Sequence, residues 1–218
     1  MKTKGKKNAG FTIIELLIAL TLSLVVLTSV SGAFVSQRKT YDAQEQMTEM
    51  IQGTRAVMEI ITREVKLAGF NPTGSTTLVG IPYSSSTKMD GTDGTPSTQL
   101  EIRADLDGDG TASSSDTNEL IIYTHDSTNF ELNRDAGQAF DYAKIPAENI
   151  QAFKVYYLDA DGNYLNAEDN PTAADIRMVE ITITGRTAKP DPDYGQNSGY
   201  RTYTLTSRVS PPNLAIGP

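Results

Sequence analysis

The sequence predicts an α+β fold in which one long N-terminal helix carries a β-rich head. Three observations lead to this prediction: an uncharged, mostly apolar run at residues 16–35, a proline-free amphipathic run after it, and several β-branched runs beyond residue 71. The 218 residues suffice for one globular domain with an appended segment. We expect four parts: a basic leader at 1–10, a transmembrane helix at 11–36, the amphipathic half of the same helix at 37–70, and the head at 71–218.

The composition excludes several classes of function. The formal net charge of -8 gives no electrostatic basis for binding nucleic acid. The absence of cysteine excludes thiol nucleophiles, disulfides, iron–sulfur clusters and the usual structural zinc sites. The sequence contains no G-x-S-x-G, P-loop or H-E-x-x-H motif, and we expect its one histidine, His125, to be a surface residue. We therefore predict that the chain is not an enzyme and requires no cofactor.

The N-terminal segment has the pattern of a membrane anchor. The first ten residues hold four lysines and no acidic residue, and Glu15 is the single charge in residues 11–36. As a helix rising about 1.5 Å per residue, residues 16–35 would cross the roughly 30 Å hydrocarbon layer. The lysines place the N-terminus in the cytoplasm and the acidic remainder outside. A secretory signal peptide and a plain signal anchor are the alternatives, but the first lacks an early cleavage site and the second does not explain Glu15.

The order of features at residues 10–20, GFTIIELLIAL, is more specific. It resembles the N-terminal cleavage and methylation segment of type IV prepilins and type II secretion pseudopilins. The resemblance implies that prepilin peptidase cuts after Gly10 on the cytoplasmic side and that the new amine of Phe11 is N-methylated. It also implies residence in the bacterial inner membrane before assembly, and in a filament in the periplasm or at the cell surface afterwards.

The resemblance gives Glu15 a role in assembly. It implies that the glutamate of one subunit meets the N-terminal amine of a neighbouring pilin. In an apolar bundle of helices each charge is costly alone and tolerable as a pair, so the pairing would select the docking depth. The alternative is a carboxylate at headgroup level that faces water.

Residues 37–68 predict the second half of the same helix. Apolar residues recur at spacings of three and four and define one face: Met47, Met50, Ile51, Val57, Met58, Ile61, Val65 and Ala68. Gly69 predicts a C-terminal cap, and Pro72 prevents continuation of the helix. Gly32 and Gly53 lie within the helix and indicate either a hinge or close packing. The segment MTEMIQGTRAVMEIITREVKLAGFNP, residues 47–72, resembles the spine of PilW-type minor pilins and, less closely, of the J-type pseudopilin of type II secretion, and its last ten residues carry the typical pattern.

The head predicts an antiparallel sheet packed on the second half of the helix. Residues 71–218 hold 21 acidic and ten basic residues. Strand-like runs occur near residues 98–104, 119–124, 149–158, 176–185 and 200–209, and Ser84–Ser97 is expected to be an exposed loop. The missing cysteine pair departs from many major pilins. We therefore expect a minor pilin at the initiation or tip position of a type IV pilus, with a type II secretion pseudopilin or a filament-borne, calcium-dependent adhesive module as alternatives.

An acidic loop in the head has the spacing of a calcium site. Oxygen-bearing residues stand at positions 1, 3, 5, 7, 9 and 12 of residues 105–116, with Gly110 at position 6. The predicted Ca²⁺ ligands are Asp105, Asp107, Asp109, Thr111 and Asp116. Position 12 is aspartate rather than glutamate, and the other interpretation is an Asp- and Gly-rich surface turn. A second acidic segment, residues 159–163, has only half of this pattern and is expected to be a hairpin turn.

Overall fold

The computed structural model describes residues 10–82, 97–137, 147–165 and 172–215. The leader residues 1–9 and residues 84–96 of the predicted polar loop lie outside the described residues. The chain divides into two compact units, residues 1–45 and 46–218, which are considered separately.

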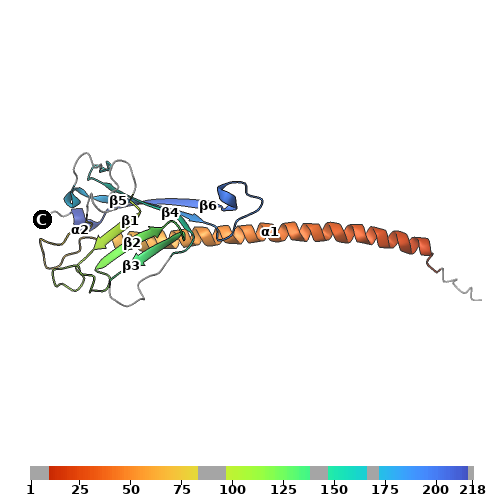
Figure 1. The fold of residues 1–218 in the computed structure, drawn as a ribbon, viewed down its shortest axis with the longest axis horizontal. Helices are drawn as coiled ribbons and strands as arrows, with labels where there is room; N and C mark the ends of the chain where they lie inside the picture. Colours follow the sequence, from red (N-terminus) through yellow and green to blue (C-terminus); the bar gives the residue numbers. More distant parts are fainter. Residues whose placement is uncertain (1–9, 83–96, 138–146, 166–171, 216–218) are drawn as a thin grey trace, which may run out of the picture. The chain divides into compact units, whose positions relative to one another are not determined.

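The predicted long helix is present as α1, Ile13–Val65 (Figure 1). The sequence predicted helix from residue 11 to residue 68, so both ends differ by two or three residues. The helix is unbroken at Gly32 and at Gly53. A Cβ atom on either glycine would meet no atom within 4 Å, so packing inside the chain does not require glycine there.

The end of α1 is fixed to the head. Gly69 has φ +76°, the left-handed conformation expected of a capping glycine. Its N–H, however, donates to the carbonyl of Arg103 at 2.9 Å instead of to a carbonyl of the helix. A Cβ on Gly80 would lie 2.2 Å from the Gly69 nitrogen, so the two backbones can approach this closely only because residue 80 is glycine.

The strands form two antiparallel sheets of three strands each, in the orders β1-β2-β3 and β4-β5-β6. Their bounds are β1 Gln99–Arg103, β2 Leu120–Asp126, β3 Glu131–Asp135, β4 Ile150–Leu158, β5 Met178–Arg186 and β6 Thr202–Val209. Two short 3₁₀ turns, η3 Ala173–Asp175 and η4 Asn197–Gly199, and the four-residue helix α2, Pro212–Ala215, complete the described elements. Isolated bridges join residue 97 to 155 and residue 132 to 147, and so connect the neighbourhoods of the two sheets.

Five of the six strands were predicted from sequence and β3 was not. Its residues, ELNRD, include no β-branched or aromatic side chain. β3 forms because it pairs with β2, where Leu132 lies opposite His125 and is 1% exposed. Contacts made at long range in sequence thus override the weak local preference.

The core lies between α1 and the two sheets. From the predicted apolar face of the helix, Met50, Met58, Ile61, Val65 and Ala68 are buried, whereas Met47, Ile51 and Val57 are half-buried. The core cluster joins Met58, Ile61 and Val65 to buried residues of both sheets. β5 shows the predicted alternation, because Val179, Ile181 and Ile183 are buried and the residues between them are less so. The α+β fold class, with an apolar N-terminal helix packed on antiparallel sheets, is therefore confirmed.

Candidate functional site

The predicted cleavage site lies immediately before α1. Gly10 and Phe11 are exposed and outside the helix, and a Cβ on Gly10 would meet nothing within 4 Å. A peptidase needs an accessible peptide bond outside regular secondary structure in order to bind its substrate. The geometry is therefore compatible with cleavage after Gly10.

Glu15 belongs to a capping box at the start of α1. The Thr12 N–H donates to Glu15 Oε2 at 2.9 Å, and the Thr12 hydroxyl donates to the same oxygen at 2.8 Å. In return the Glu15 N–H donates to Thr12 Oγ1 at 3.3 Å. This reciprocal pattern satisfies N–H groups that have no partner within the helix. This capping box was not predicted from sequence, although T-x-x-E before an apolar run is its signature.

The first unit presents an apolar helix surface along its length. Its exposed large apolar residues run from Phe11 through Ile13, Leu16, Leu20, Leu24 and Val30 to Phe34 and Val35. Within the described residues, α1 is the one helix long and apolar enough to cross a membrane. Four of its hydroxyl groups, on Thr21, Ser23, Thr28 and Ser29, donate to carbonyls three or four residues earlier in the helix. Such bonds satisfy hydroxyl groups where no water is available.

The acidic loop lies between β1 and β2 and is organised around Asp105, which is fully buried. Asp105 Oδ1 accepts from the Gly108 N–H at 2.7 Å, and Oδ2 accepts from the Gly110 N–H at 3.0 Å. Oδ2 also accepts from the Thr73 hydroxyl at 3.1 Å. The two glycines have φ of +83° and +88°, so the sharp turn expected at Gly110 is present.

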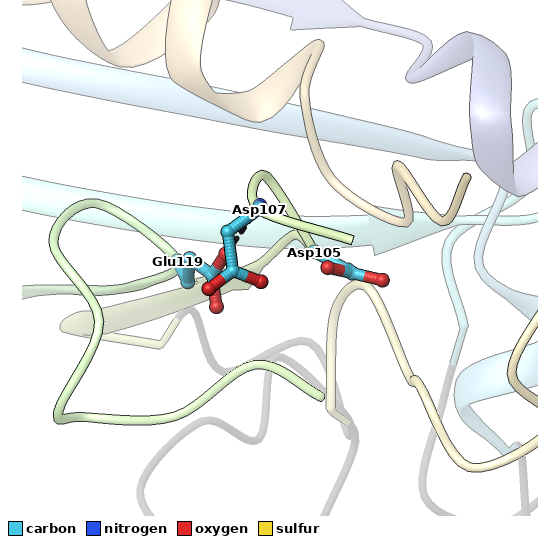
Figure 2. Close-up of side chains that lie close together, drawn as sticks. All are labelled: Asp105, Asp107 and Glu119. Carbon is cyan, nitrogen blue, oxygen red and sulfur yellow. Dashed lines mark hydrogen bonds between the residues drawn. The ribbon is translucent and has the colours of Figure 1, made fainter. Parts of the chain in front are cut away.

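Three carboxylates come together at this loop, from Asp105, Asp107 and Glu119 (Figure 2). One oxygen from each lies within 4.8 Å of the others. Glu119 is 2% exposed, and its Oε1 accepts from the N–H groups of Leu106 at 2.7 Å and Asp107 at 3.0 Å. Its Oε2 is buried and has no hydrogen-bond partner in the described part of the chain.

The other predicted ligands have different surroundings. Asp109 Oδ1 accepts from the N–H of Thr111 at 2.7 Å and from its hydroxyl at 2.8 Å. The Asp116 N–H donates to the Ser113 carbonyl at 3.1 Å in a turn. Neither Asp109 nor Asp116 belongs to the group of three carboxylates. The third carboxylate of the group comes from Glu119 instead. Glu119 lies three residues beyond Asp116, the last position of the calcium-loop template.

The second acidic segment is a hairpin turn, as predicted. The Asp159 N–H donates to the Asn163 carbonyl at 3.0 Å, and Leu158 pairs with Tyr164. Bonds from the Asn163 side-chain amide and backbone N–H lower the pKa of the exposed Asp159 carboxyl. Asp159 thus stabilises the turn through its own side chain.

His125, which was expected from sequence to be a surface residue, is half-buried. Its Nε2 lies 2.9 Å from the Ile150 carbonyl oxygen, and its backbone N–H donates to the Thr98 carbonyl at 3.1 Å. It therefore connects β2 to the start of β4. No local pattern in the sequence predicts this contact.

A buried polar contact that was not predicted from sequence connects α1 to the first sheet. Glu64, 8% exposed, accepts a short hydrogen bond from the Tyr123 hydroxyl and a bidentate pair from Arg134, whose Nη2 lies 2.9 Å from Oε1. Burial, followed by the neighbouring Glu64 carboxylate, raises the pKa of Tyr123 well above its usual value. The helix is therefore held in register by charge as well as by apolar packing.

Comparison with known proteins supports the interpretation of the N-terminus. Residues 5–31 match the family model described as the prokaryotic N-terminal methylation motif. A search of curated proteins gave no match. Among solved structures, the chain is similar to a type IV-like pilin from Thermus thermophilus, with a TM-score of 0.42 and 14% identity, over 76% of this chain and 98% of that chain. The N-terminal segment therefore carries a prokaryotic N-terminal methylation motif, which agrees with its resemblance to prepilins.

Proposed function

We propose that the chain is a structural subunit of a type IV pilus, in the particular role of a minor pilin at the initiation or tip position. One observation carries the proposal: an exposed Gly10-Phe11 bond directly precedes a capped apolar helix, inside a matched methylation motif. A subunit of this kind works by binding other pilins, and it needs neither catalytic residues nor a cofactor.

Processing would prepare the helix for assembly. Prepilin peptidase would cut after Gly10 and remove the leader with its four lysines. The new ammonium on Phe11 would be methylated and would keep its positive charge. Before assembly the helix would anchor the chain in the bacterial inner membrane with its N-terminus in the cytoplasm.

Assembly would bring Glu15 of one subunit to the Phe11 amine of the next. A lone carboxylate in the centre of a bilayer costs about 2.5–3.5 kcal/mol on insertion scales, and less near the interface. Pairing with an ammonium removes much of this cost, so helices docked at the correct depth are preferred. The exposed apolar surface of residues 11–35 then packs against the N-terminal helices of other pilins.

The first test is the chemical state of the N-terminus. The chain is isolated from membranes of cells with and without the peptidase, and its intact mass and N-terminal sequence are determined. We expect methylated Phe11 with the peptidase and unmodified Met1 without it. A chain that starts at Met1 in both strains would refute the proposed processing and leave a signal-anchored protein.

The second test is incorporation into filaments. Glu15→Gln removes the charge but retains an oxygen that can accept from Thr12, so the helix cap is preserved. We expect cleavage to proceed and the amount of the chain in sheared filaments to fall at least tenfold. Glu49→Gln, at an exposed glutamate on the same helix, is the matched control and should assemble normally. Normal incorporation of Glu15→Gln would contradict the pairing.

The principal competing function is a type II secretion pseudopilin, because the resemblance of the N-terminal segment covers both systems. Deletion of the gene separates them: loss of surface pili supports the minor pilin, and loss of secreted enzymes with pili intact supports the pseudopilin. A calcium-dependent adhesive module would instead leave filament number unchanged and abolish attachment.

A further inference from the structure

We propose that Asp105, Asp107 and Glu119 form a binding site for a single divalent cation, and that the ion is Ca²⁺. The site differs from the one that the sequence template indicates, because it includes Glu119 and excludes Asp109 and Asp116. It also does not depend on the role of the N-terminal helix, since all three residues belong to the second unit.

The first argument is the uncompensated charge of the group. Asp105 is 0% exposed and Glu119 is 2% exposed, and each has an oxygen within 4.8 Å of an oxygen of the other and of Asp107. The ion pairs formed in the described part of the chain involve other carboxylates, on Glu64, Glu101, Glu180 and Asp191. Buried carboxylates at such a distance from one another are unfavourable unless a cation or a proton compensates them.

The second argument is the unsatisfied oxygen of Glu119. Both oxygens of Asp105 accept hydrogen bonds, and Glu119 Oε1 accepts two from the loop backbone. These bonds hold the two carboxylates in fixed positions. Glu119 Oε2 is also buried but has no partner among the described residues. A buried polar atom without a partner is costly, and a bound cation would satisfy it.

The number and chemistry of the oxygens favour calcium. Ca²⁺ binds oxygen ligands at 2.3–2.6 Å, so two ligands of one ion lie at most about 5.2 Å apart. The three carboxylate oxygens lie within 4.8 Å of one another and meet this condition. Mg²⁺ demands near-ideal octahedral geometry, keeps several waters and usually binds only one or two carboxylates, so a set of three carboxylates favours Ca²⁺. Asp107 is exposed, so water can complete the coordination from its side.

The cation would stabilise the connection between α1 and the sheets. The Asp105 N–H donates to the Phe70 carbonyl at 2.8 Å, and the Asp105 carboxylate accepts from Thr73. Phe70 and Thr73 belong to the segment that directly follows the end of α1. An ion that neutralises the carboxylates would therefore fasten the loop 105–119 against the C-terminal end of the spine helix.

The test is calcium binding by the full chain in detergent micelles. After removal of metal with EGTA, Ca²⁺ is titrated by calorimetry, and thermal unfolding is followed by near-ultraviolet circular dichroism with and without 10 mM Ca²⁺. We expect one ion per chain with a dissociation constant of about 10⁻⁴ M, in the range of extracellular calcium modules. At 10 mM Ca²⁺, about a hundredfold above this dissociation constant, the midpoint of thermal unfolding should rise by about 5 °C or more.

Four variants identify the ligands. Asp107→Asn and Glu119→Gln should each weaken Ca²⁺ binding at least tenfold. Because Asp107 is exposed, the Asp107→Asn variant should fold normally without the ion. Asp116→Asn and Asp161→Asn, in the turn at 159–163, should bind within twofold of the native chain. Absence of Ca²⁺ binding in the native chain would overturn the proposal. Retention of binding in both Asp107→Asn and Glu119→Gln would also overturn it, and so would loss of binding in Asp116→Asn. Equal binding of Mg²⁺ and Ca²⁺ would overturn the assignment of the ion.

Discussion

The spine helix packs directly against Gly185 of β5. A Cβ atom at this position would lie 2.2 Å from Thr54 Oγ1 of α1, whereas Met50 Cγ and Thr54 Cβ would be at 3.4 and 3.5 Å. The Thr54 hydroxyl is buried and donates to the Met50 carbonyl at 2.7 Å. It therefore cannot rotate away without losing its hydrogen bond.

Gly185→Ala should consequently destabilise the head by about 1–3 kcal/mol, the usual cost of overpacking a core. Thr54→Ala removes the clashing oxygen and leaves the new methyl group with ordinary contacts at 3.4 and 3.5 Å. The double variant should therefore be more stable than the two single effects predict, with a coupling energy of about 0.5–3 kcal/mol. This compensation is specific to the observed helix position.

The assay is urea unfolding of the full chain in detergent, followed by the near-ultraviolet signal of the tyrosines. The matched control is Gly195→Ala, because a Cβ at Gly195 would meet nothing within 4 Å. Its free energy of unfolding should change by no more than about 0.5 kcal/mol. Equal unfolding of Gly185→Ala and Gly195→Ala, or additive effects in the double variant, would refute the proposed contact between α1 and β5.

Two further predictions concern the buried contact around Glu64. Glu64→Ala should lower the free energy of unfolding by about 3 kcal/mol, because the Arg134 guanidinium, whose side chain is 14% exposed, loses its opposite charge and keeps only its bond to Asn118. Glu59→Ala, on the exposed side of α1, is the control, and an equal effect of both substitutions would contradict the role of Glu64. Tyr123 should make the head sensitive to alkali. Burial and the Glu64 carboxylate raise its pKa in the folded chain, so the stabilisation is complete below the unfolded pKa of about 10 and is lost as the pH rises above it. Above pH 10, the free energy of unfolding of Tyr123→Phe should therefore fall less steeply with pH than that of the native chain. If the two free energies fall with the same slope, Tyr123 does not titrate in this way.

The elements predicted from sequence are those specified by local patterns. The helix follows from apolar spacing and the absence of proline, and β5 from strict alternation over residues 178–186. β3 has no such pattern and forms through its pairing with β2. The division of the strands between two sheets likewise depends on contacts between distant segments, which one sequence does not reveal.

The same distinction applies to the acidic loop. Asp105 and Asp107 were predicted because they stand at fixed positions in a contiguous template. Glu119 lies outside that template and reaches the group because Oε1 accepts from the N–H groups of Leu106 and Asp107. A glutamate that precedes an apolar strand looks like an ordinary strand residue in sequence. Its role depends on how the loop closes on itself.

The capping box at the start of α1 is compatible with the proposed pairing between subunits. Both hydrogen bonds from Thr12, at 2.9 and 2.8 Å, go to Glu15 Oε2. Oε1 accepts no hydrogen bond from any described residue and is available to a neighbouring ammonium. A carboxylate can accept donors on both oxygens, so a subunit need not sacrifice the cap of its own helix, worth about 0.5–2 kcal/mol, in order to assemble. The cap also restrains the Glu15 side chain before assembly, which lowers the entropy lost when the pair forms. Thr12 would therefore act as a positioning residue for Glu15 in the proposed filament.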